Sequence, residues 1–366
     1  MLKRIYIDNF RGLVNFELNV DSINLFLGGN GSGKSTVFEA LRKIQTFISG
    51  DQKIERIFKS SNCTRWQKKP VQKFELEIDG NNGTYKYELA IHCQKHKIEY
   101  ERLWFDNKYL LIYEDQKTKF YRDDYSLSSE FVLPLPHSFL SLVSPEMDNS
   151  KLVWFKESLE KIIIVQIVPS QIVDSSKQEE PKLNYYIDNF VSWYRYVSQD
   201  QGKTAQLISV LQDVLSGFVS FKFEKSIEDS RTLKLRFSSE EDKTKIIDYR
   251  LNELSDGQKV LIALYTLLYC TESEDYTLCI DEPENFLALP EIQPWLRQLY
   301  DLCDEGKLQA LLISHHPECI NYLLASPIGY WFERQSNAPV RVRKISNEEA
   351  DDSGLKISEL IARGWL

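Results

Sequence analysis

The residues best suited to chemistry lie close to the start of the chain, in the segment GGNGSGKST that covers residues 28–36. Gly28, Gly33, Lys34 and Ser35 satisfy the pattern G-x-x-x-x-G-K-[ST]. Glycines let the backbone curl until successive N–H groups point inward at a phosphate, and a helix start beyond them adds its dipole. The lysine supplies a mobile positive charge, and a hydroxyl is a ligand that Mg²⁺ accepts. The segment therefore predicts a phosphate-binding loop.

The flanking residues supply the elements that such a loop needs. Residues 23–27 are apolar, as in a short buried strand, and the helix after the loop would bury one stripe of apolar side chains at helical spacing. This strand, loop and helix order is the context that the pattern requires. We expect Lys34 to reach the β- and γ-phosphates of a nucleotide and Ser35 to bind Mg²⁺. The expected nucleotide contacts of the loop are Asn30, Gly31, Gly33, Lys34, Ser35 and Thr36.

Two adjacent carboxylates end an apolar segment much later in the chain, YTLCIDEP at residues 276–283. Asp281 at a strand end would lie near Mg²⁺, and Glu282 would polarise an attacking water. An apolar strand that ends in Asp-Glu is also common without such a role, so this pattern alone leaves both interpretations open. Its wide separation from Lys34 predicts a large insertion between the two segments.

A third segment, LSDGQ at residues 254–258, opens a strongly apolar helix. A hydroxyl and a glycine at a helix N-terminus, Ser255 and Gly257, predict a second phosphate contact. The alternative is an ordinary N-cap serine.

Composition limits the class of protein. With 366 residues, 42% of them apolar, the chain can form two lobes or one large α/β body with insertions. Its net charge of −9 argues against wholesale binding of polyanions, although a local basic strip is compatible with it. Six cysteines show no C-x-x-C pattern, and several lie in apolar segments where a reduced thiol packs as a small hydrophobe. No apolar run approaches the length of a membrane span. We expect a cytoplasmic, globular protein without a membrane anchor.

Periodicity predicts the remaining elements. Residues 73–121 alternate as in an antiparallel meander, with a turn at DGNNG, and residues 151–161 form a helix after a segment with loops at Pro134, Pro136 and Pro145. A strand is expected at 161–168, helices within 183–217 and short strands within 218–237. The predicted fold is α/β, a mixed sheet with an antiparallel β meander and an inserted helical lobe. The expected domains are 1–180 and 218–366, two parts of one head, and the lobe 181–217.

The order of these segments resembles that of ABC-type P-loop ATPases: phosphate loop, LSDGQ, apolar strand with Asp-Glu-Pro, then ALLISHHPE at residues 310–318. The opening IYIDNFRGLVNFEL and the loop form G-x-N-G-x-G-K-S look like the branch that contains RecF, SMC proteins and the OLD (overcoming lysogenisation defect) ATPases. The stretch DEPENFLALPEIQPWL is most similar to the OLD-like branch. The resemblance covers roughly residues 1–48 and 250–320.

The resemblance implies ATP and Mg²⁺ as ligands and assigns roles. Asp281 supports Mg²⁺, Glu282 is the general base and His315 is the switch histidine, while Glu284 and Asn285 form the loop after the carboxylates. It implies a head-to-tail homodimer in which the phosphate loop of one protomer meets the signature helix of the other across ATP. The implied signature contacts are Ser255, Gly257 and Gln258.

The chain departs from the family pattern in two places. Gln166 and Gln171 both follow the right kind of strand for the glutamine loop, and the sequence does not choose between them. OLD nucleases carry a Toprim domain beyond the histidine, whereas only a short segment follows His315, so we expect that nuclease to be absent.

Other candidates have simpler explanations. Arg11 in NFRGL has a counterpart near nucleotide in this branch, but a surface arginine is nearly as good an interpretation. His316 competes with its neighbour His315 for the switch role. His92 and His96 flank Cys93 but lack a fourth metal ligand nearby, so we interpret them as surface histidines. The segments RVRK at 341–344 and Lys68-Lys69 are expected to be solvent-facing rather than a nucleic-acid strip.

The leading functional hypothesis is an ATP-hydrolysing regulatory or sensor subunit of a bacterial anti-phage system, with a separate effector such as a nuclease or toxin. The alternative is a RecF-like or SMC-like repair ATPase, which would bind DNA with a steep salt dependence. Nucleic acid is thus a possible partner that the charge does not indicate. A pure interaction protein with a degenerate site is opposed by the intact Lys34, Asp281 and Glu282.

Overall fold

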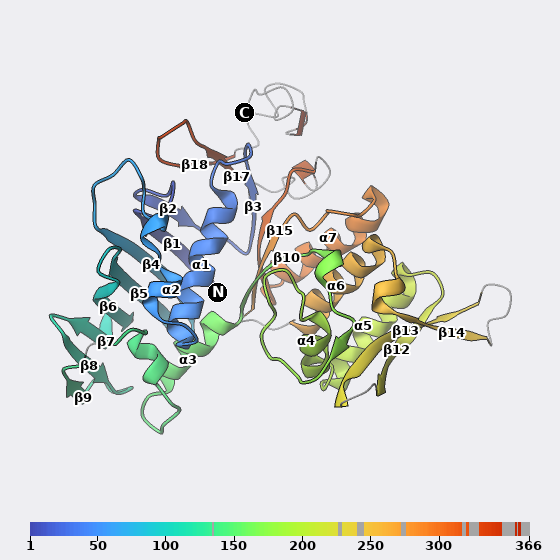
Figure 1. Cartoon of the computed structure of the whole chain (residues 1–366), viewed down its shortest axis with the longest axis horizontal. Coiled ribbons are helices and arrows are strands. Elements are labelled where there is room, and N and C mark those ends of the chain that lie inside the picture. The colour runs from blue at the N-terminus through green and yellow to red at the C-terminus, as the bar shows by residue number, and fades with distance from the viewer. Residues whose placement is uncertain are drawn as a thin grey trace. The chain divides into compact units, whose positions relative to one another are not determined.

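The computed structural model describes residues 1–133, 135–225, 229–239, 245–271, 276–316, 320–321, 329–345, 356 and 358–359. The chain forms two compact units (Figure 1). Unit 1 comprises Met1–Ile162, Asp275–Thr277 and Pro327–Ser346. Unit 2 comprises Ile163–Glu274, Leu278–Ser326 and Asn347–Leu366. The domain boundaries expected from sequence at residues 180 and 217 stay a prediction.

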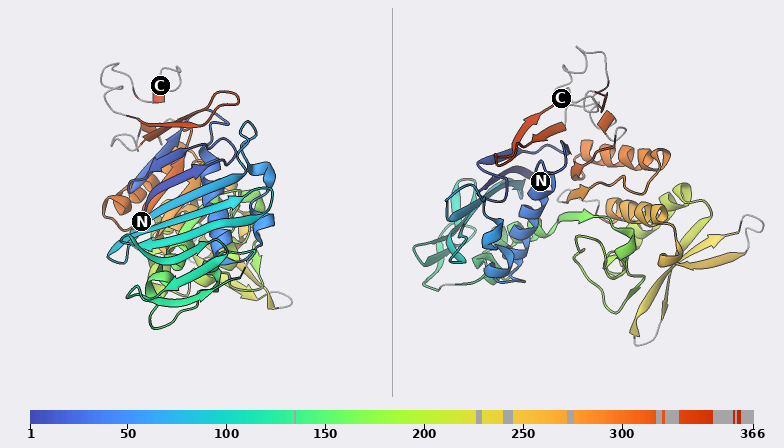
Figure 2. Two further views of the ribbon diagram at one scale, coloured as in Figure 1. Left: turned by 90° about the vertical axis from the view of Figure 1, so that its left-hand side faces the viewer. Right: turned by 45° about the horizontal axis from the view of Figure 1, so that its top comes forward.

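Unit 1 is built on an eight-stranded antiparallel sheet of order β2-β1-β4-β5-β6-β7-β8-β9, seen face-on in the left view of Figure 2. The hairpin of β4 and β5 turns at Asn81 and Asn82, both with positive φ, as its short loop requires. The predicted meander is confirmed and extends one strand further. The strands are β1 (Leu2–Asp8), β2 (Phe16–Asn19), β4 (Val71–Gly80), β5 (Gly83–His92), β6 (Lys97–Phe105), β7 (Lys108–Glu114), β8 (Lys117–Tyr121) and β9 (Leu127–Phe131).

A second layer of unit 1 carries the phosphate loop. Strand β3 (Ile23–Leu27) pairs in parallel with β17 (Gly329–Glu333), which pairs antiparallel with β18 (Arg341–Lys344). Helix α1 (Lys34–Ser49) follows the loop and buries its predicted apolar stripe. Phe38 of this helix packs on Phe26 of β3. RVRK forms β18, which ends its sheet and is mostly exposed, as predicted.

Several short helices accompany α1 in unit 1, and α2, η2 and α3 contact it. The predicted helix near residues 151–161 is α3, and Gln45 of α1 donates to the carbonyls of Leu159 and Ile162 at its end, both at 2.6 Å. Pro136 and Pro145 lie in loops as expected, whereas Pro134 lies outside the described residues. The helices are α2 (Ile54–Ile57), η1 (Ser60–Asn62), η2 (Phe139–Leu142) and α3 (Ser150–Glu160).

Unit 2 combines strand β15, which ends at the carboxylate segment, and its neighbouring strands with a helical part and a small antiparallel sheet. Strand β10 neighbours β15, and β15 neighbours β16. The helices expected within 183–217 and the strands expected within 218–237 are confirmed. The elements are β10 (Ile162–Gln166), η3 (Pro169–Gln171), β11 (Ser175–Ser176), α4 (Phe190–Val197), α5 (Gln201–Val214), β12 (Phe218–Lys225), β13 (Arg231–Ser238), β14 (Ile246–Arg250), η5 (Leu251–Glu253), α6 (Asp256–Cys270), β15 (Thr277–Asp281), α7 (Leu289–Asp304) and β16 (Gln309–Ile313).

The cysteines divide into two groups. Cys270, Cys279 and Cys303 are buried free thiols, and burial raises their pKa, to about 12 for Cys270, as expected of small packed hydrophobes. Cys63 and Cys93 instead form a disulfide. The sequence did not predict this bond, which joins Cys63, directly after η1, to Cys93, directly after β5, over 30 positions of the chain. Cys319 lies outside the described residues.

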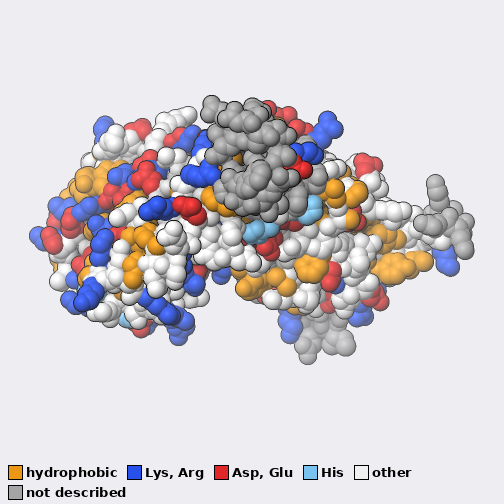
Figure 3. Space-filling view, turned by 90° about the horizontal axis from the view of Figure 1, so that it is seen from above, with side chains coloured by type: hydrophobic (Ala, Val, Ile, Leu, Met, Phe, Trp, Pro, Cys, Tyr) orange, Lys and Arg blue, Asp and Glu red, His pale blue; other side chains and the backbone are white. Residues whose placement is uncertain are grey.

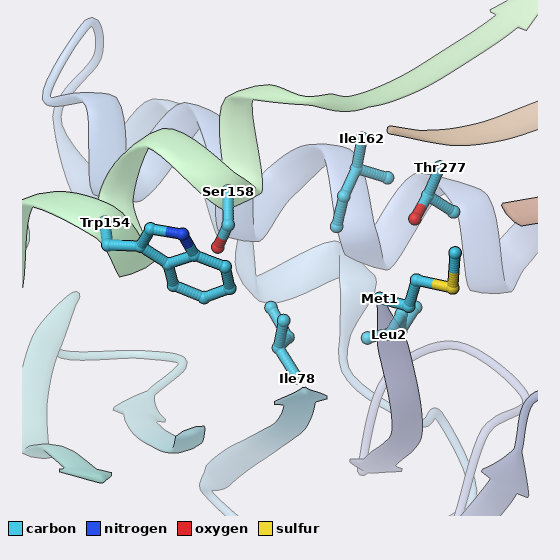
Figure 4. A pocket seen from close by; sticks show the side chains of 7 residues that line it. All are labelled: Met1, Leu2, Ile78, Trp154, Ser158, Ile162 and Thr277. Atoms are coloured by element: carbon cyan, nitrogen blue, oxygen red, sulfur yellow. The ribbon is translucent and has the colours of Figure 1, made fainter. Parts of the chain in front are cut away.

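The core of unit 1 is closely packed. A small cavity of about 10 Å³ lies beneath α3 and is lined by Met1, Leu2, Ile78, Trp154, Ser158, Ile162 and Thr277 (Figure 4). That volume is close to the least that admits one water molecule. Within the described residues, no helix combines the length and the apolarity that a membrane crossing requires.

Unit 1 buries one carboxyl group completely. Glu101 of β6 accepts hydrogen bonds from Tyr87 Oη at 2.9 Å, from the backbone N–H of Phe139 at 2.8 Å and from Ser138 Oγ. Burial raises the pKa of Glu101 and these hydrogen bonds lower it. Because burial is the larger effect, the pKa rises from 4.5 to about 7. The side chain thereby ties η2 to the sheet.

We expect this carboxyl to make the stability of unit 1 depend on pH. Because its folded pKa exceeds its ordinary value, the folded state binds more protons between about pH 4.5 and 7, so stability falls as the pH rises through this window. The effect is up to about 3 kcal/mol. Glu101→Gln should abolish this part of the pH dependence, measured as unfolding midpoints at several pH values. Glu99→Gln controls for the loss of one negative charge from β6. An identical pH slope in wild type and Glu101→Gln would contradict the expectation.

Candidate functional site

In the phosphate loop of unit 1, the side chain of Lys34 folds back over the backbone of the loop. Lys34 Nζ donates to the carbonyl oxygen of Gly28 at 2.7 Å and to that of Gly29 at 3.1 Å. The residue is only 6% exposed, so its ammonium is held within the loop. Phosphate oxygens are stronger acceptors for an ammonium than neutral carbonyls are. The loop therefore holds a charge that a phosphate would draw away from the carbonyls.

Two glycines of the loop are required by close contacts with the β17–β18 hairpin. A Cβ at Gly28, where φ is +135°, would lie 2.1 Å from the carbonyl oxygen of Phe332. A Cβ at Gly33, where φ is +110°, would lie 2.7 Å from a methyl group of Val340. The backbone N–H of Val340 also donates to Gly12. The hairpin thus restrains the phosphate loop, and no sequence motif predicts this role.

The start of α1 presents hydrogen-bond donors. Gly33 precedes the helix, and no described side chain caps it, so N–H groups of the first turn are available to an anion. Ser35 is exposed in this turn, and Asn30 and Gly31 are exposed in the loop before it. Thr36 is half-buried and its N–H donates to the carbonyl oxygen of Gly33 at 3.1 Å. The predicted phosphate-contacting residues therefore lie on one short loop and helix start.

Arg11 lies in unit 1 and contacts the same helix. Its guanidinium forms a two-pronged ion pair with Glu39 of α1, at 2.8 and 2.9 Å, and its side chain is 51% exposed. Arg11 is therefore bound to the helix that follows the loop, and its approach to nucleotide stays a prediction.

In unit 2 the two carboxylates follow β15 directly. Asp281 is buried and accepts from Tyr185 Oη at 3.4 Å, a long hydrogen bond. Glu282 has φ of +54°, a left-handed conformation that is uncommon for a non-glycine residue and is often found at functional sites. Its N–H donates to the carbonyl oxygen of Ile313 at 2.8 Å, and Asn285 Nδ2 donates to its Oε2 at 2.7 Å. The side chain of Glu282 is thus oriented by Asn285.

The two histidines follow β16 on the loop beside these carboxylates. His315 is exposed and His316 is half-buried, and the switch role of His315 stays a prediction. Their backbone N–H groups donate to Glu284 Oε1 at 3.2 and 3.3 Å. Glu284 therefore connects the loop after β15 with the loop after β16.

The segment LSDGQ at residues 254–258, the signature segment of the family resemblance, lies at the start of α6. Ser255 is its exposed N-cap: its Oγ accepts from the N–H of Gln258 at 3.2 Å, and Gln258 Oε1 accepts from the N–H of Ser255 at 3.1 Å. The capping serine foreseen as an alternative is therefore present. Capping and presentation to a ligand are compatible, because both place the hydroxyl at the helix N-terminus. A Cβ at Gly257 would lie 3.0 Å from the carbonyl oxygen of Phe286, which fits this helix closely against the loop after β15.

Several weaker candidates are now placed. Gln166 ends β10, where its N–H donates to the carbonyl oxygen of Tyr185 at 2.7 Å, and Gln171 is exposed in η3. His92 accepts from the N–H of Lys95 at 3.3 Å, and the disulfide removes Cys93 as a ligand beside it. Among the described residues, no group of three or more His, Cys, Asp or Glu side chains suits a metal ion. Tyr185 was missed from sequence, because it belongs to no motif.

Comparison with solved structures places the fold among SMC head domains. An SMC head bound to the C-winged helix domain of ScpA has a TM-score of 0.58 at 12% identity, over 95% of this chain and 99% of that one. The SMC head from Thermotoga maritima scores 0.52 at 15% identity, over 94% and 99% of the chains. An SMC head with an extended coiled coil, bound to a C-terminal domain of ScpA derived from Pyrococcus furiosus, scores 0.52 at 11% identity, over 96% and 98%. At such identities the likeness shows the fold, which is that of an ABC-type P-loop ATPase domain.

Sequence comparison shows the family. No curated protein matches the chain. The family described as "AAA domain, putative AbiEii toxin, Type IV TA system" matches residues 23–321, well over half of the chain, which include the phosphate loop, the signature helix, both carboxylates and the histidines. The chain belongs to this family of AAA-type P-loop domains.

Proposed function

We propose that this protein binds and hydrolyses ATP, dimerises head to tail around the nucleotide, and serves as the regulatory or sensor subunit of a bacterial anti-phage system with a separate effector. The observation that carries the proposal is the phosphate loop, in which Lys34 lies over backbone carbonyls beside an uncapped start of α1. Charge, exposed N–H donors and glycine contacts there all suit a polyphosphate.

Ser35 and Asp281 are proposed as the Mg²⁺ ligands, as the family resemblance implies. Ser35 offers an exposed hydroxyl in the first turn of α1 in unit 1, and Asp281 offers a carboxylate at the end of β15 in unit 2, both of them hard oxygen ligands. When bound, the ion would neutralise charge on the β- and γ-phosphates. Lys34 would then bind the phosphates as a mobile cation.

Glu282 is proposed as the general base. Asn285 occupies one of its carboxylate oxygens, so we expect the other to accept the proton of the attacking water. The left-handed backbone at Glu282 holds the side chain directly beyond the buried strand. His315, exposed on the neighbouring loop, is proposed to contact the γ-phosphate.

The dimer is proposed from the exposure of the signature segment. Ser255 lies at the exposed N-terminus of α6, a helix whose remaining length is largely buried. An exposed helix start with a hydroxyl suits the γ-phosphate held by another protomer. ATP would then join two copies, and hydrolysis would release them.

The biological assignment is supported by the family description, which names a putative AbiEii toxin of a type IV toxin–antitoxin system. The OLD-like form of the segment after Glu282 agrees with an anti-phage role. The charge distribution on the face shown in Figure 3 gives little support to the DNA-repair alternative. On the face in Figure 3, basic and acidic side chains of unit 1 are interspersed rather than collected in one basic strip, and the net charge is −9.

Lys34→Ala should lower ATP affinity on the order of 100-fold, because it removes the cation aimed at the phosphates. Calorimetry or a fluorescent ATP analogue measures the affinity. Lys43→Ala is the matched control, since Lys43 is also on α1 but its ammonium binds the carbonyl oxygen of Ile57. Unchanged affinity in folded Lys34→Ala would refute the phosphate-loop assignment.

Glu282→Gln should bind ATP with near wild-type affinity and hydrolyse it on the order of 10² to 10⁴ times more slowly, since an amide cannot accept the proton of the water. Steady-state phosphate release measures turnover. Glu305→Gln, an exposed glutamate in unit 2 paired with Lys307, is the control. Wild-type turnover in Glu282→Gln would move the base elsewhere, with His315 as the first candidate.

ATP should drive association of the Glu282→Gln protein, because its nucleotide persists. Adding Ser255→Arg should prevent association while leaving ATP binding intact, because a bulky side chain at the start of α6 would exclude the opposing γ-phosphate. Light scattering with and without ATP and Mg²⁺ measures the mass. Equal dimerisation of the single and double variants would show that α6 is not the contact in trans.

A further inference from the structure

One buried carboxylate in unit 2 has no role in the proposed chemistry so far. Glu284 is 8% exposed and lies two residues after Glu282. Its Oε1 accepts three hydrogen bonds from the loop after β16: from Ser314 Oγ at 2.6 Å, from the N–H of His315 at 3.2 Å and from that of His316 at 3.3 Å. Three donors on one oxygen hold that loop in a single conformation.

The same two loops are joined at a second point. The N–H of Glu282 donates to the carbonyl oxygen of Ile313, directly before Ser314. Glu282 and His315 therefore lie on segments that are tied together by one backbone bond and by the carboxylate of Glu284. Of these two links, removal of the carboxylate leaves the backbone bond, which lies before the histidine and does not fix it.

We propose that Glu284 is a positioning residue that holds His315 in register with Glu282, so that histidine and base meet the same γ-phosphate. The assignment deepens the proposed ATPase function and rests on it. Glu284 acts through the backbone of the loop after β16 (the histidine loop). In the described contacts it touches neither the side chain of Glu282 nor that of His315.

The other carboxylate oxygen makes the role specific. Glu284 Oε2 is fully shielded and has no hydrogen-bond partner among the described residues. Only Oε1 is therefore used, and the carbonyl oxygen of a glutamine can replace it at the same position and length. Alanine instead leaves the hydroxyl of Ser314 and the N–H of His315 without this acceptor, while the N–H of His316 keeps Ser314 Oγ. Gln should thus rescue what Ala loses.

The first test needs no nucleotide. Amide hydrogen exchange, followed by NMR, should show the N–H of His315 exchanging about 10-fold or more faster in Glu284→Ala than in wild type, because its acceptor is gone. The N–H of His316 should change less, because it also donates to Ser314 Oγ. The N–H of Glu282 should keep its protection, and Glu284→Gln should restore slow exchange. Glu291→Ala is the matched control: Glu291 also accepts from a backbone N–H, that of Ala288 at 2.7 Å, but it does not contact the histidine loop. Unchanged exchange at His315 in Glu284→Ala would overturn the proposal.

The second test separates positioning from general stability. Glu284→Ala should lower kcat about 10- to 100-fold with the Kd for ATP within about threefold of wild type, and Glu284→Gln should recover most of kcat. A parallel loss of kcat and of ATP affinity that glutamine does not rescue would indicate a merely structural role. If wild type hydrolyses no ATP, the proposed function fails while the exchange result still decides the positioning. If Glu284→Ala does not fold, Ser314→Ala, which removes one of the three donors to Glu284 Oε1, must accelerate exchange at His315, whose N–H donates to that same oxygen. Unchanged exchange at His315 in Ser314→Ala would count against the proposal.

Discussion

The close approach of the phosphate loop to the β17–β18 hairpin is the constraint on which unit 1 depends. Gly28 leaves no room for a side chain against the carbonyl oxygen of Phe332, and Gly33 leaves none against Val340. A glycine loses more backbone conformational entropy on folding than other residues do, and packing around the loop must offset this cost. Phe26 supplies part of that packing, since it contacts Phe38 of α1 on one side and Phe332 of β17 on the other. A loop held in this way presents its donors without reorganising when a phosphate binds.

Unit 2 follows a different physical principle, in which strained or buried polar groups are kept in place by hydrogen bonds. Glu282 adopts a left-handed backbone, and Glu284 is buried with one unused oxygen. Both features cost free energy unless neighbouring hydrogen-bond donors and acceptors compensate for them. Ile313, Ser314 and Asn285 supply those partners, and all lie within a few residues of β15 or β16. The concentration of such groups at one place is typical of a functional site rather than of a structural core.

The large sheet of unit 1 supports helix α1, which follows the phosphate loop, from a second side. Phe47 of α1 packs against Phe58, which in turn packs against Phe74 of β4. Glu101 ties η2 to the same sheet, and Gly50, directly after α1, approaches Ser141 of η2 closely. Helix α1 is thereby packed on both of its sides within unit 1. A helix fixed along its length keeps its N-terminus, where the phosphates are proposed to bind, in a constant direction.

The sequence by itself determined the local elements and the chemistry that they carry. Glycine spacing, Lys34 and the apolar stripe after it define a phosphate loop and its helix, because loop conformation and helix amphipathicity are short-range properties. Alternation likewise predicted the meander, and apolar runs predicted β10 and β15. Only the tertiary structure decided the partners: Val340 behind Gly33, Cys63 with Cys93, and Tyr185 on Asp281. Glu284 was visible from sequence only as a residue after the carboxylates, whereas its three donors come from another strand end. Such contacts join residues far apart in the chain, and no local pattern records which of many compatible surfaces will meet when the chain folds.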